Sequence, residues 1–366
     1  MLLSVVVHTH SLRYLAPAAV MLGSAPAYVL CWAAGRALLL LAPGRLRRRL
    51  DDRLYDLYQS LVLLFFENYT GLEVVLYGDL PSEKENVIYL SNHQSTVDWV
   101  VADMLAVRQN ALGHVRYVLK DGLKWLPLYG WYFSQHGGVY VKRRDHYNEK
   151  AIERKLKAQM EAQIPMYLVI FPEGTRYNPE AANVIEASKA FANKEGLPEL
   201  SHVLTPRIRA THAALNAMSD HLHAIYDITV AYEGTLDAAG RRKTAPSMPE
   251  FLCCESPRVH IHFERIDIQE VPHEPHFFKL WLHERFEKKD KLMADFYERA
   301  ATKGGEWGFP GSPKASRLRL RRTLPSAVFL ATLTLPMLLT ETGRSVYWRT
   351  WLYGTLLGWA WVAALP

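Results

Sequence analysis

The stretch NVIYLSNHQSTVDWVVADMLAV, residues 86–107, decides how the middle of this chain folds. Residues 86–90 form a short apolar run rich in β-formers, which predicts a buried strand. Residues 96–107 carry apolar side chains at helical spacing and predict a helix. His93 and Asp98 lie at the junction, and on a straight helix they would be about 140° out of phase. They can meet only if His93 is in the turn and Asp98 is in the first helical turn.

A histidine that meets a carboxylate in this way can act as a base. The carboxylate accepts a hydrogen bond from one ring nitrogen, which leaves the other nitrogen free to take a proton. A histidine that only satisfies its hydrogen bonds in a strand-to-helix turn fits the same spacing. The spacing of His93 and Asp98 alone favours this structural interpretation, and a second stretch changes the balance.

That second stretch is MYLVIFPEGTR, residues 166–176. Its first part is a buried-strand pattern that ends at Pro172, and a turn follows. Gly174 allows a positive φ or the close approach of a ligand. Arg176 offers a planar fork of donors that suits phosphate. A surface ion pair between Arg176 and Glu173 is the alternative, and it would be favoured if Arg176 were considered alone.

Two further stretches add weaker signals. Cations recur around glycines in residues 120–130 and 136–143, where one or two of them could face an anionic head group. Lys120, Gly138 and Arg143 are the residues of interest there. The fourth stretch, LTPRI at residues 204–208, contains Pro206 and by itself indicates a structural role.

Strands and helices alternate between residues 74 and 268, which predicts an α/β domain with a mixed sheet and flanking helices. Residues 149–161 and 276–299 are the clearest helices, and residues 233–257 are expected to form a surface loop. The predicted strands are residues 74–77, 86–90, 115–119, 138–142, 166–171, 225–232 and 259–266.

Both ends of the chain are apolar. Residues 14–35 carry no formal charge and are long enough to cross a bilayer; a cleaved signal peptide would be shorter and would end at a cleavage site. Residues 324–339 and 346–365 predict an apolar hairpin, with one span plus a buried segment as the alternative. Arginine clusters flank both ends on the domain side, which favours a cytosolic domain. The predicted division is 1–50 membrane helix and basic flank, 51–73 amphipathic helix at the interface or against the domain, 74–302 α/β domain, 303–323 basic linker, and 324–366 membrane segments.

Composition narrows the choice of function. The formal net charge of +6 is compatible with nucleic acid, an anionic membrane surface or an anionic substrate. The aromatic residues are not interleaved with a basic stripe, so no nucleic-acid partner is expected. Three cysteines without metal spacing predict no metal site. The chain lacks the Gly-x-Ser-x-Gly elbow of serine hydrolases, although Ser95 remains a conceivable nucleophile.

The four stretches, in this order, resemble the four motifs of the glycerolipid acyltransferases. His93 and Asp98 match the His-x4-Asp motif, and Gly138 and Arg143 match the second motif. Residues 171–176 match the third motif, with Glu173, Gly174, Thr175 and Arg176, and Pro206 matches the fourth. Each match is weak alone, and the ordered set is specific.

The resemblance implies the glycerolipid acyltransferase fold and transfer of an acyl chain from acyl-CoA to the sn-2 hydroxyl of lysophosphatidic acid, giving phosphatidic acid. It implies that His93 is the general base and that Asp98 holds its tautomer. Acyl-CoA is then a co-substrate, and no other cofactor is expected. The bilayer is an expected partner, in the endoplasmic reticulum, the nuclear envelope or the mitochondrial outer membrane. Protein partners are not indicated.

The resemblance also implies a phosphate site. Arg176 would hold the phosphate with help from Arg143 and Lys120, and Glu173 would orient Arg176 or a glycerol hydroxyl. The alternatives are an acyltransferase for another lysophospholipid, such as lysocardiolipin, a hydrolase, or a non-catalytic membrane protein that binds anionic lipid. A binder needs no base, so the His93–Asp98 pair argues against the last of these.

Overall fold

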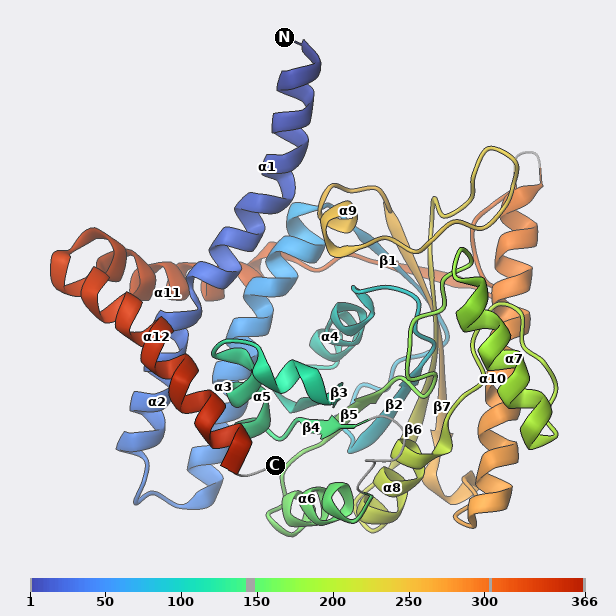
Figure 1. The fold of residues 1–366 in the computed structure, drawn as a ribbon, viewed down its shortest axis with the longest axis horizontal. Coiled ribbons are helices and arrows are strands. Elements are labelled where there is room, and N and C mark those ends of the chain that lie inside the picture. Colours follow the sequence, from blue (N-terminus) through green and yellow to red (C-terminus); the bar gives the residue numbers. More distant parts are fainter. Residues whose placement is uncertain (1, 143–148, 303–304, 365–366) are drawn as a thin grey trace. The chain divides into compact units, whose positions relative to one another are not determined.

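The structure is a computed structural model that describes residues 2–142, 149–302 and 305–364. The chain forms two compact units, each assembled from separate stretches (Figure 1). The first unit holds Met1–Tyr69, Asn110–Asn148 and Leu318–Pro366, and the second holds Thr70–Gln109 and Glu149–Arg317. This division differs from the predicted one, because residues 110–148 belong with the two ends of the chain and not with the α/β domain.

The second unit is built on six strands in the order β5-β2-β6-β7-β1-β8. Strand β2 is parallel to both β5 and β6, and β1 is parallel to β7. The pairs β6–β7 and β1–β8 are antiparallel, so the predicted mixed sheet is confirmed. The strands are β1 (Glu73–Tyr77), β2 (Val87–Ser91), β5 (Tyr167–Ile170), β6 (Ala224–Tyr232), β7 (Arg258–Asp267) and β8 (Pro313–Ser316).

The parallel register of β2 and β5 positions the candidate site. Leu90 pairs with Ile170 at the carboxyl ends of the two strands. The loops that leave β2 and β5 therefore start side by side at one edge of the sheet, where α/β folds characteristically place their sites. The first loop carries His93 and the second carries Glu173.

Helices cover this sheet. Helix α10 packs on β6 and on α8, α4 packs on β5, and α6 packs on α8. The predicted helix at residues 149–161 is confirmed as α6. The helices of the second unit are α4 (Asp98–Arg108), α6 (Glu149–Glu161), α7 (Ala182–Glu195), α8 (Ile208–Met218), α9 (Met248–Leu252), η5 (Ile268–Glu270) and α10 (Pro275–Ala301).

The segment predicted as a basic linker is partly folded. Phe309 is buried and its ring meets that of Tyr77 edge-on, with the centroids 5.5 Å apart. Residues 313–316 then pair with β1 as strand β8. The prediction of a linker over 303–323 is wrong for this part, because β1 offers an edge that the segment completes.

The first unit is mainly helical. Helix α3 packs on α2, α11 and η2, which buries its apolar stripe inside the unit, as expected for a core-facing helix. Strands β3 and β4 form a parallel pair. The elements are α1 (Leu2–Gly23), α2 (Ala25–Leu38), α3 (Gly44–Leu63), the π-helix η1 (Leu64–Tyr69), η2 (Leu112–His114), β3 (Val115–Lys120), η3 (Asp121–Trp125), α5 (Tyr129–Gln135), β4 (Val139–Val141), α11 (Leu320–Leu339) and α12 (Glu341–Ala364).

Two stretches among the described residues are long and apolar enough to cross a membrane, Ser11–Leu38 and Leu320–Leu339. The first is interrupted at Ser24, between α1 and α2. Helix α2 also makes polar contacts within the unit, where Trp32 donates to Asp51 at 2.7 Å. The second stretch is α11, which packs against α12 as the predicted helical hairpin (Figure 1).

Candidate active site

His93 and Asp98 meet as the strand–turn–helix pattern predicts. His93 lies in the turn after β2, and Asp98 is the first residue of α4. The distance from His93 Nδ1 to Asp98 Oδ2 is 2.7 Å. Because the carboxylate can only accept, Nδ1 carries the proton and Nε2 is left as the basic nitrogen. The imidazole is about a quarter exposed (24%) and stacks on Phe171, with the ring centroids 4.5 Å apart.

Asp98 is fully buried and is held from both sides. Its Oδ2 accepts hydrogen bonds from the backbone amides of Gln94 (2.7 Å) and Ser95 (2.8 Å) as well as from His93. Its Oδ1 accepts from the hydroxyl of Tyr232 at 2.6 Å. These donors at the N-terminus of α4 hold the carboxylate in one orientation. Asp98 therefore both orients the imidazole and can stabilise an imidazolium.

Glu173 joins the two loops at the sheet edge. Its Oε1 accepts from the backbone amide of His93 at 2.7 Å, and its Oε2 accepts from that of Leu204 at 2.9 Å. The side chain is buried, and burial raises its pKa to about 8, against the opposing effect of the Leu204 and His93 amides. Glu173 was expected to orient Arg176 or a glycerol hydroxyl; in the structure its two oxygens hold two backbone amides, and among the described residues it makes no ion pair with Arg176.

The turn after Glu173 is open to solvent. Gly174 has a φ of +68°, a conformation that glycine adopts without strain, and a Cβ there would meet no atom within 4 Å. Thr175 is half-buried and Arg176 is exposed. Within the described residues, Arg176 makes no ion pair and no hydrogen bond through its side chain, so the alternative of a surface ion pair with Glu173 is not formed. Its guanidinium can meet a ligand without breaking a protein contact.

The fourth motif supports the third. Pro206 is buried just before α8 begins. On either side of it, Leu204 donates to Glu173, and the amide of Arg207 donates to the carbonyl of Pro172 at 2.8 Å. Pro206 therefore belongs to a segment that holds the Glu173 turn in place.

The residues of the second motif lie in the first unit. Lys120 is exposed at the end of β3. Gly138 precedes β4, and a Cβ there would come within 2.9 Å of the carbonyl oxygen of Phe133, so only glycine fits. Arg143 lies outside the described residues. The structure therefore assembles His93, Asp98, Glu173, Gly174, Thr175, Arg176 and Pro206 in one unit, while Lys120 and Gly138 belong to the other.

Ser95 is not placed to act as a nucleophile. It is buried, its hydroxyl donates to the carbonyl of Pro246, and the same oxygen accepts from the amide of Val97 at 2.9 Å. These bonds make Ser95 a brace for the start of α4.

Several residues that contact the site were not predicted by any sequence motif. Asn92 and Gln94 both donate to the carbonyl of Val230, at 3.0 Å and 2.6 Å, and fasten the turn to β6. Tyr232 reaches Asp98 from the end of β6, and Arg242 donates to Gln94 at 2.7 Å. For Tyr232, the available signal was a tyrosine, which has a polar tip, at the end of a fully buried strand.

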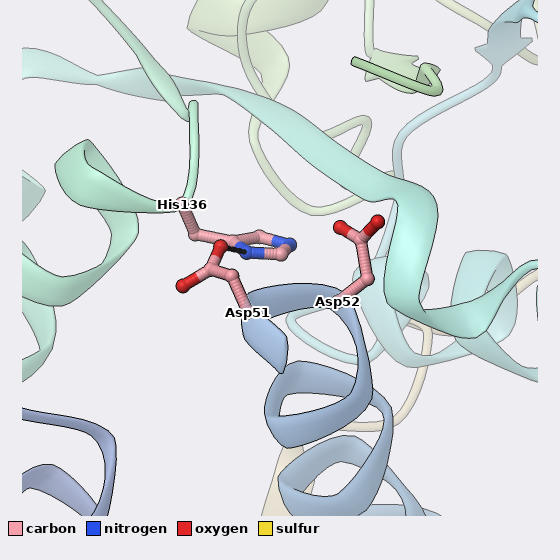
Figure 2. A group of neighbouring side chains, drawn as sticks. All are labelled: Asp51, Asp52 and His136. Atoms are coloured by element: carbon pink, nitrogen blue, oxygen red, sulfur yellow. Dashed lines mark hydrogen bonds and ion pairs between the residues drawn. The ribbon is translucent and has the colours of Figure 1, made fainter. Parts of the chain in front are cut away.

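A second cluster of titratable groups lies in the first unit, where Asp51 and Asp52 project from α3 toward His136 (Figure 2). Their potential ligand atoms all lie within 4.8 Å of one another. Asp51 accepts from His136 Nδ1 at 2.8 Å and from Trp32, and Asp52 accepts from Arg116 at 2.7 Å. Burial, with the charge of Arg116, lowers the pKa of His136.

These contacts engage both oxygens of Asp51 and one of Asp52, while the buried His136 Nε2 has no hydrogen-bond partner among the described residues. Arg116 also donates to the carbonyl of His136 at 3.1 Å. The cluster is therefore an ion-pair network that ties α3 to β3 and to the end of α5.

The carboxyl ends of the strands in this mixed sheet thus carry a buried carboxylate and a partly exposed imidazole, the arrangement of a general base with its orienting group. The sequence matches the family model Acyltransferase over residues 70–239 and the model Acyltransferase C-terminus over residues 250–331. The chain belongs to the acyltransferase family.

Its relatives include lipid acyltransferases. It is similar to mouse 1-acyl-sn-glycerol-3-phosphate acyltransferase epsilon, with 59% identity over 361 residues, which are 99% of each chain. It is 31% identical over 254 residues to a probable 1-acyl-sn-glycerol-3-phosphate acyltransferase 5 of Arabidopsis thaliana, covering 69% of this chain and 64% of that one. It is 29% identical over 265 residues to zebrafish (Danio rerio) lysocardiolipin acyltransferase 1, covering 71% and 65%.

Proposed function

We propose that this enzyme transfers the acyl group of acyl-CoA to the sn-2 hydroxyl of lysophosphatidic acid and forms phosphatidic acid for phospholipid synthesis. The observation that carries the proposal is the 2.7 Å contact between His93 Nδ1 and Asp98 Oδ2, which leaves Nε2 free as a base. The mouse relative, named for this substrate, supports the choice of acceptor and is similar over the whole chain.

In this mechanism, His93 Nε2 takes the proton of the acceptor hydroxyl as its oxygen attacks the thioester carbonyl. The new C–O bond gives a tetrahedral intermediate, and its collapse breaks the C–S bond. The departing thiolate then takes the proton back from the imidazolium and leaves as CoA. Asp98 stabilises the transient positive charge on the imidazole. A thioester is already activated, so the enzyme needs no acyl-enzyme intermediate.

Arg176 is proposed to bind the phosphate of the acceptor. Arg176 is exposed on the turn that follows Glu173, and Glu173 accepts a hydrogen bond from the backbone amide of His93 at 2.7 Å. The phosphate of the acceptor would thus meet Arg176 and its hydroxyl would meet His93, on two loops that the Glu173 hydrogen bond joins. Gly174 and Thr175 would contribute to the same pocket. Lys120, Gly138 and Arg143 remain proposed contributors from the first unit.

A second candidate is transfer to another lysophospholipid, and the similarity to lysocardiolipin acyltransferase 1 favours it. The two candidates share His93 and Asp98 and differ in the acceptor. We further propose that the protein resides in the endoplasmic reticulum membrane, with the nuclear envelope and the mitochondrial outer membrane as alternatives, and that its second unit faces the cytosol.

The test is an acyl-transfer assay on membranes containing the protein, with a panel of lysophospholipid acceptors and acyl-CoA donors. Wild type should form phosphatidic acid only when lysophosphatidic acid and acyl-CoA are both present. His93→Ala should lower the rate by about 10²–10⁴-fold, which is the usual contribution of a general base. Asp98→Asn should cost nearly as much. A His93→Ala protein that keeps more than half of the activity would rule out the mechanism.

A further inference from the structure

The segment between β6 and β7, residues 233–257, contacts the turn that carries His93 at three points. The carbonyl of Pro246 accepts from the Ser95 hydroxyl, and the amide of Met248 donates to Thr96 Oγ1 at 3.1 Å. The third contact is charged, since Arg242 Nη2 donates to Gln94 Oε1 at 2.7 Å. The segment was expected to be a surface loop, and it braces the turn instead.

Arg242 holds this position through four interactions in the second unit. Besides Gln94, its guanidinium donates through Nη1 to the carbonyl of His202 at 2.8 Å. Its Cζ also lies 4.3 Å from the ring centroid of Tyr177 and 4.7 Å from that of Tyr297. A guanidinium between two aromatic rings is held by stacking as well as by hydrogen bonds. Arg242 therefore connects loops that are distant in sequence.

Gln94 links Arg242 to the carboxylate that holds the His93 imidazole. Its side-chain amide lies between Arg242 and the carbonyl of Val230, and its backbone amide donates to Asp98 Oδ2, the same oxygen that holds His93. A shift of Gln94 would therefore move the shared acceptor of the His93 ring. Errors of about 1 Å in the position of a reacting group can cost about 100-fold in rate.

We propose that Arg242 is a positioning residue for acyl transfer, which acts through Gln94 to hold the turn of His93 so that Nε2 stays at the reacting position. The proposal rests on the proposed role of His93 as the base. Arg242 directs its terminal nitrogens at protein acceptors, in contrast to Arg176, whose side chain meets none among the described residues. Arg242 is therefore assigned to the geometry of the base and Arg176 to the substrate.

The experiment compares R242Q, R242K, Q94A and the double variant R242Q/Q94A in steady-state acyl transfer, with melting temperatures measured in parallel. The matched control is R241Q, because Arg241 is 81% exposed and pairs only locally with Asp237. We expect kcat to fall about 10- to 100-fold in R242Q and in Q94A, with KM for both substrates within about twofold of wild type. The double variant should lose no more than the worse single variant, because both act on one turn.

R242K should recover only part of the rate, since lysine keeps the charge but cannot stack and reach both acceptors. If R242Q does not fold, R242K and Q94A make the same comparison. Losses that multiply in the double variant, a change confined to KM, or a folded R242Q with kcat within twofold of wild type would each overturn the proposal. Failure of the proposed function itself would give a different result. In that case wild type would form no product, or His93→Ala would keep the wild-type rate.

Discussion

At the scale of single residues, the site separates groups that are buried and engaged from groups that are open. Asp98 and Glu173 are buried, and every oxygen of these two side chains accepts a hydrogen bond from the protein. Arg176 is exposed and the His93 ring is partly exposed. The buried carboxyl groups of Asp98 and Glu173 therefore set geometry, while the imidazole and the guanidinium can reach a substrate.

Arg176→Lys tests the phosphate assignment. Lysine keeps the charge but cannot offer two parallel donors to a phosphate monoester. Hydrogen bonds to charged groups contribute about 1.5–3 kcal/mol, so kcat/KM for lysophosphatidic acid should fall about 10- to 150-fold. Steady-state kinetics with lysophosphatidylcholine, a diester, should show a much smaller loss. Equal losses on the two acceptors would mean that Arg176 supports the fold or the CoA site.

Glu173→Gln tests the buried carboxyl. Burial raises the pKa of Glu173 to about 8 in the folded protein, whereas an unfolded glutamate titrates near 4.5. Because the folded pKa is the higher one, the stability that this group contributes is full below about pH 4.5 and is lost as the pH rises through about 8. Urea unfolding in detergent at pH 5.5 and 8.5 should therefore show a larger loss for wild type than for Glu173→Gln.

The control for that experiment is Glu180→Gln, which changes an exposed glutamate of the same segment and should follow wild type. An equal loss in wild type and Glu173→Gln would contradict the raised pKa. The expected result would also explain why a carboxyl next to the proposed phosphate site would not repel a phosphate near neutral pH.

The sequence predicted one part of this site and not the other. The meeting of His93 with Asp98 follows from local structure, because a strand, a turn and a helix start determine both positions. The bonds from Glu173 to Leu204 and from Tyr232 to Asp98 join residues 31 and 134 positions apart. Such contacts depend on how the strands are ordered in the sheet, which no local pattern specifies.

At the scale of elements, too, the features set by local sequence were predicted and those set by long-range contacts were not. The seven predicted strands carry β-branched or aromatic runs, and all seven are present with small changes at their ends. Strand β8 reads Pro-Lys-Ala-Ser and forms only because β1 offers an open edge. Helix α7 buries one residue, Ala192, so it has no apolar stripe to predict it. Helix α10 was predicted, but one buried position on its stripe is charged.

That position is Lys289, which is 1% exposed on α10. Its ammonium pairs with Asp227 and donates to the carbonyl of Ile228 at 2.6 Å. Lys289→Met keeps the volume but leaves Asp227 buried, with Arg285 as its one remaining charged partner among the described residues. Breaking a buried pair costs about 3–5 kcal/mol, so the free energy of unfolding should fall by about 3 kcal/mol.

The adjacent Lys288 gives the matched control for Lys289. Its side chain is 46% exposed and pairs with Glu264. Lys288→Met should change the free energy of unfolding by less than about 1 kcal/mol, as expected for a surface pair. Urea denaturation of both variants in detergent makes the comparison. Similar small losses in the two would show that the buried ammonium does not stabilise the fold.

At the scale of the whole molecule, the stretches that form the two units alternate along the chain. The first unit takes both ends of the chain and residues 110–148, and it contains both stretches that could cross a membrane. The second unit carries His93, Asp98 and Arg176. Large apolar side chains on α11 and α12 are exposed, among them Leu335, Leu339, Trp348 and Leu357. Such a surface is expected to contact lipid, and Trp348 is of the type enriched at membrane interfaces.

The protein should therefore remain with membranes in alkaline carbonate and be released by detergent. The orientation of the protein across the membrane can be tested with trypsin, because the exposed bend at Arg241 and Lys243 offers a cleavage site in the second unit. In the sequence, the arginine clusters at residues 45–49 and 317–322 follow the first apolar stretch and precede the second, so both separate an apolar stretch from the middle of the chain, which predicts a cytosolic location for the second unit. Trypsin added to sealed microsomes should cut this bend while a lumenal marker stays intact. Cleavage only after permeabilisation would place the second unit, and with it acyl transfer, on the lumenal side.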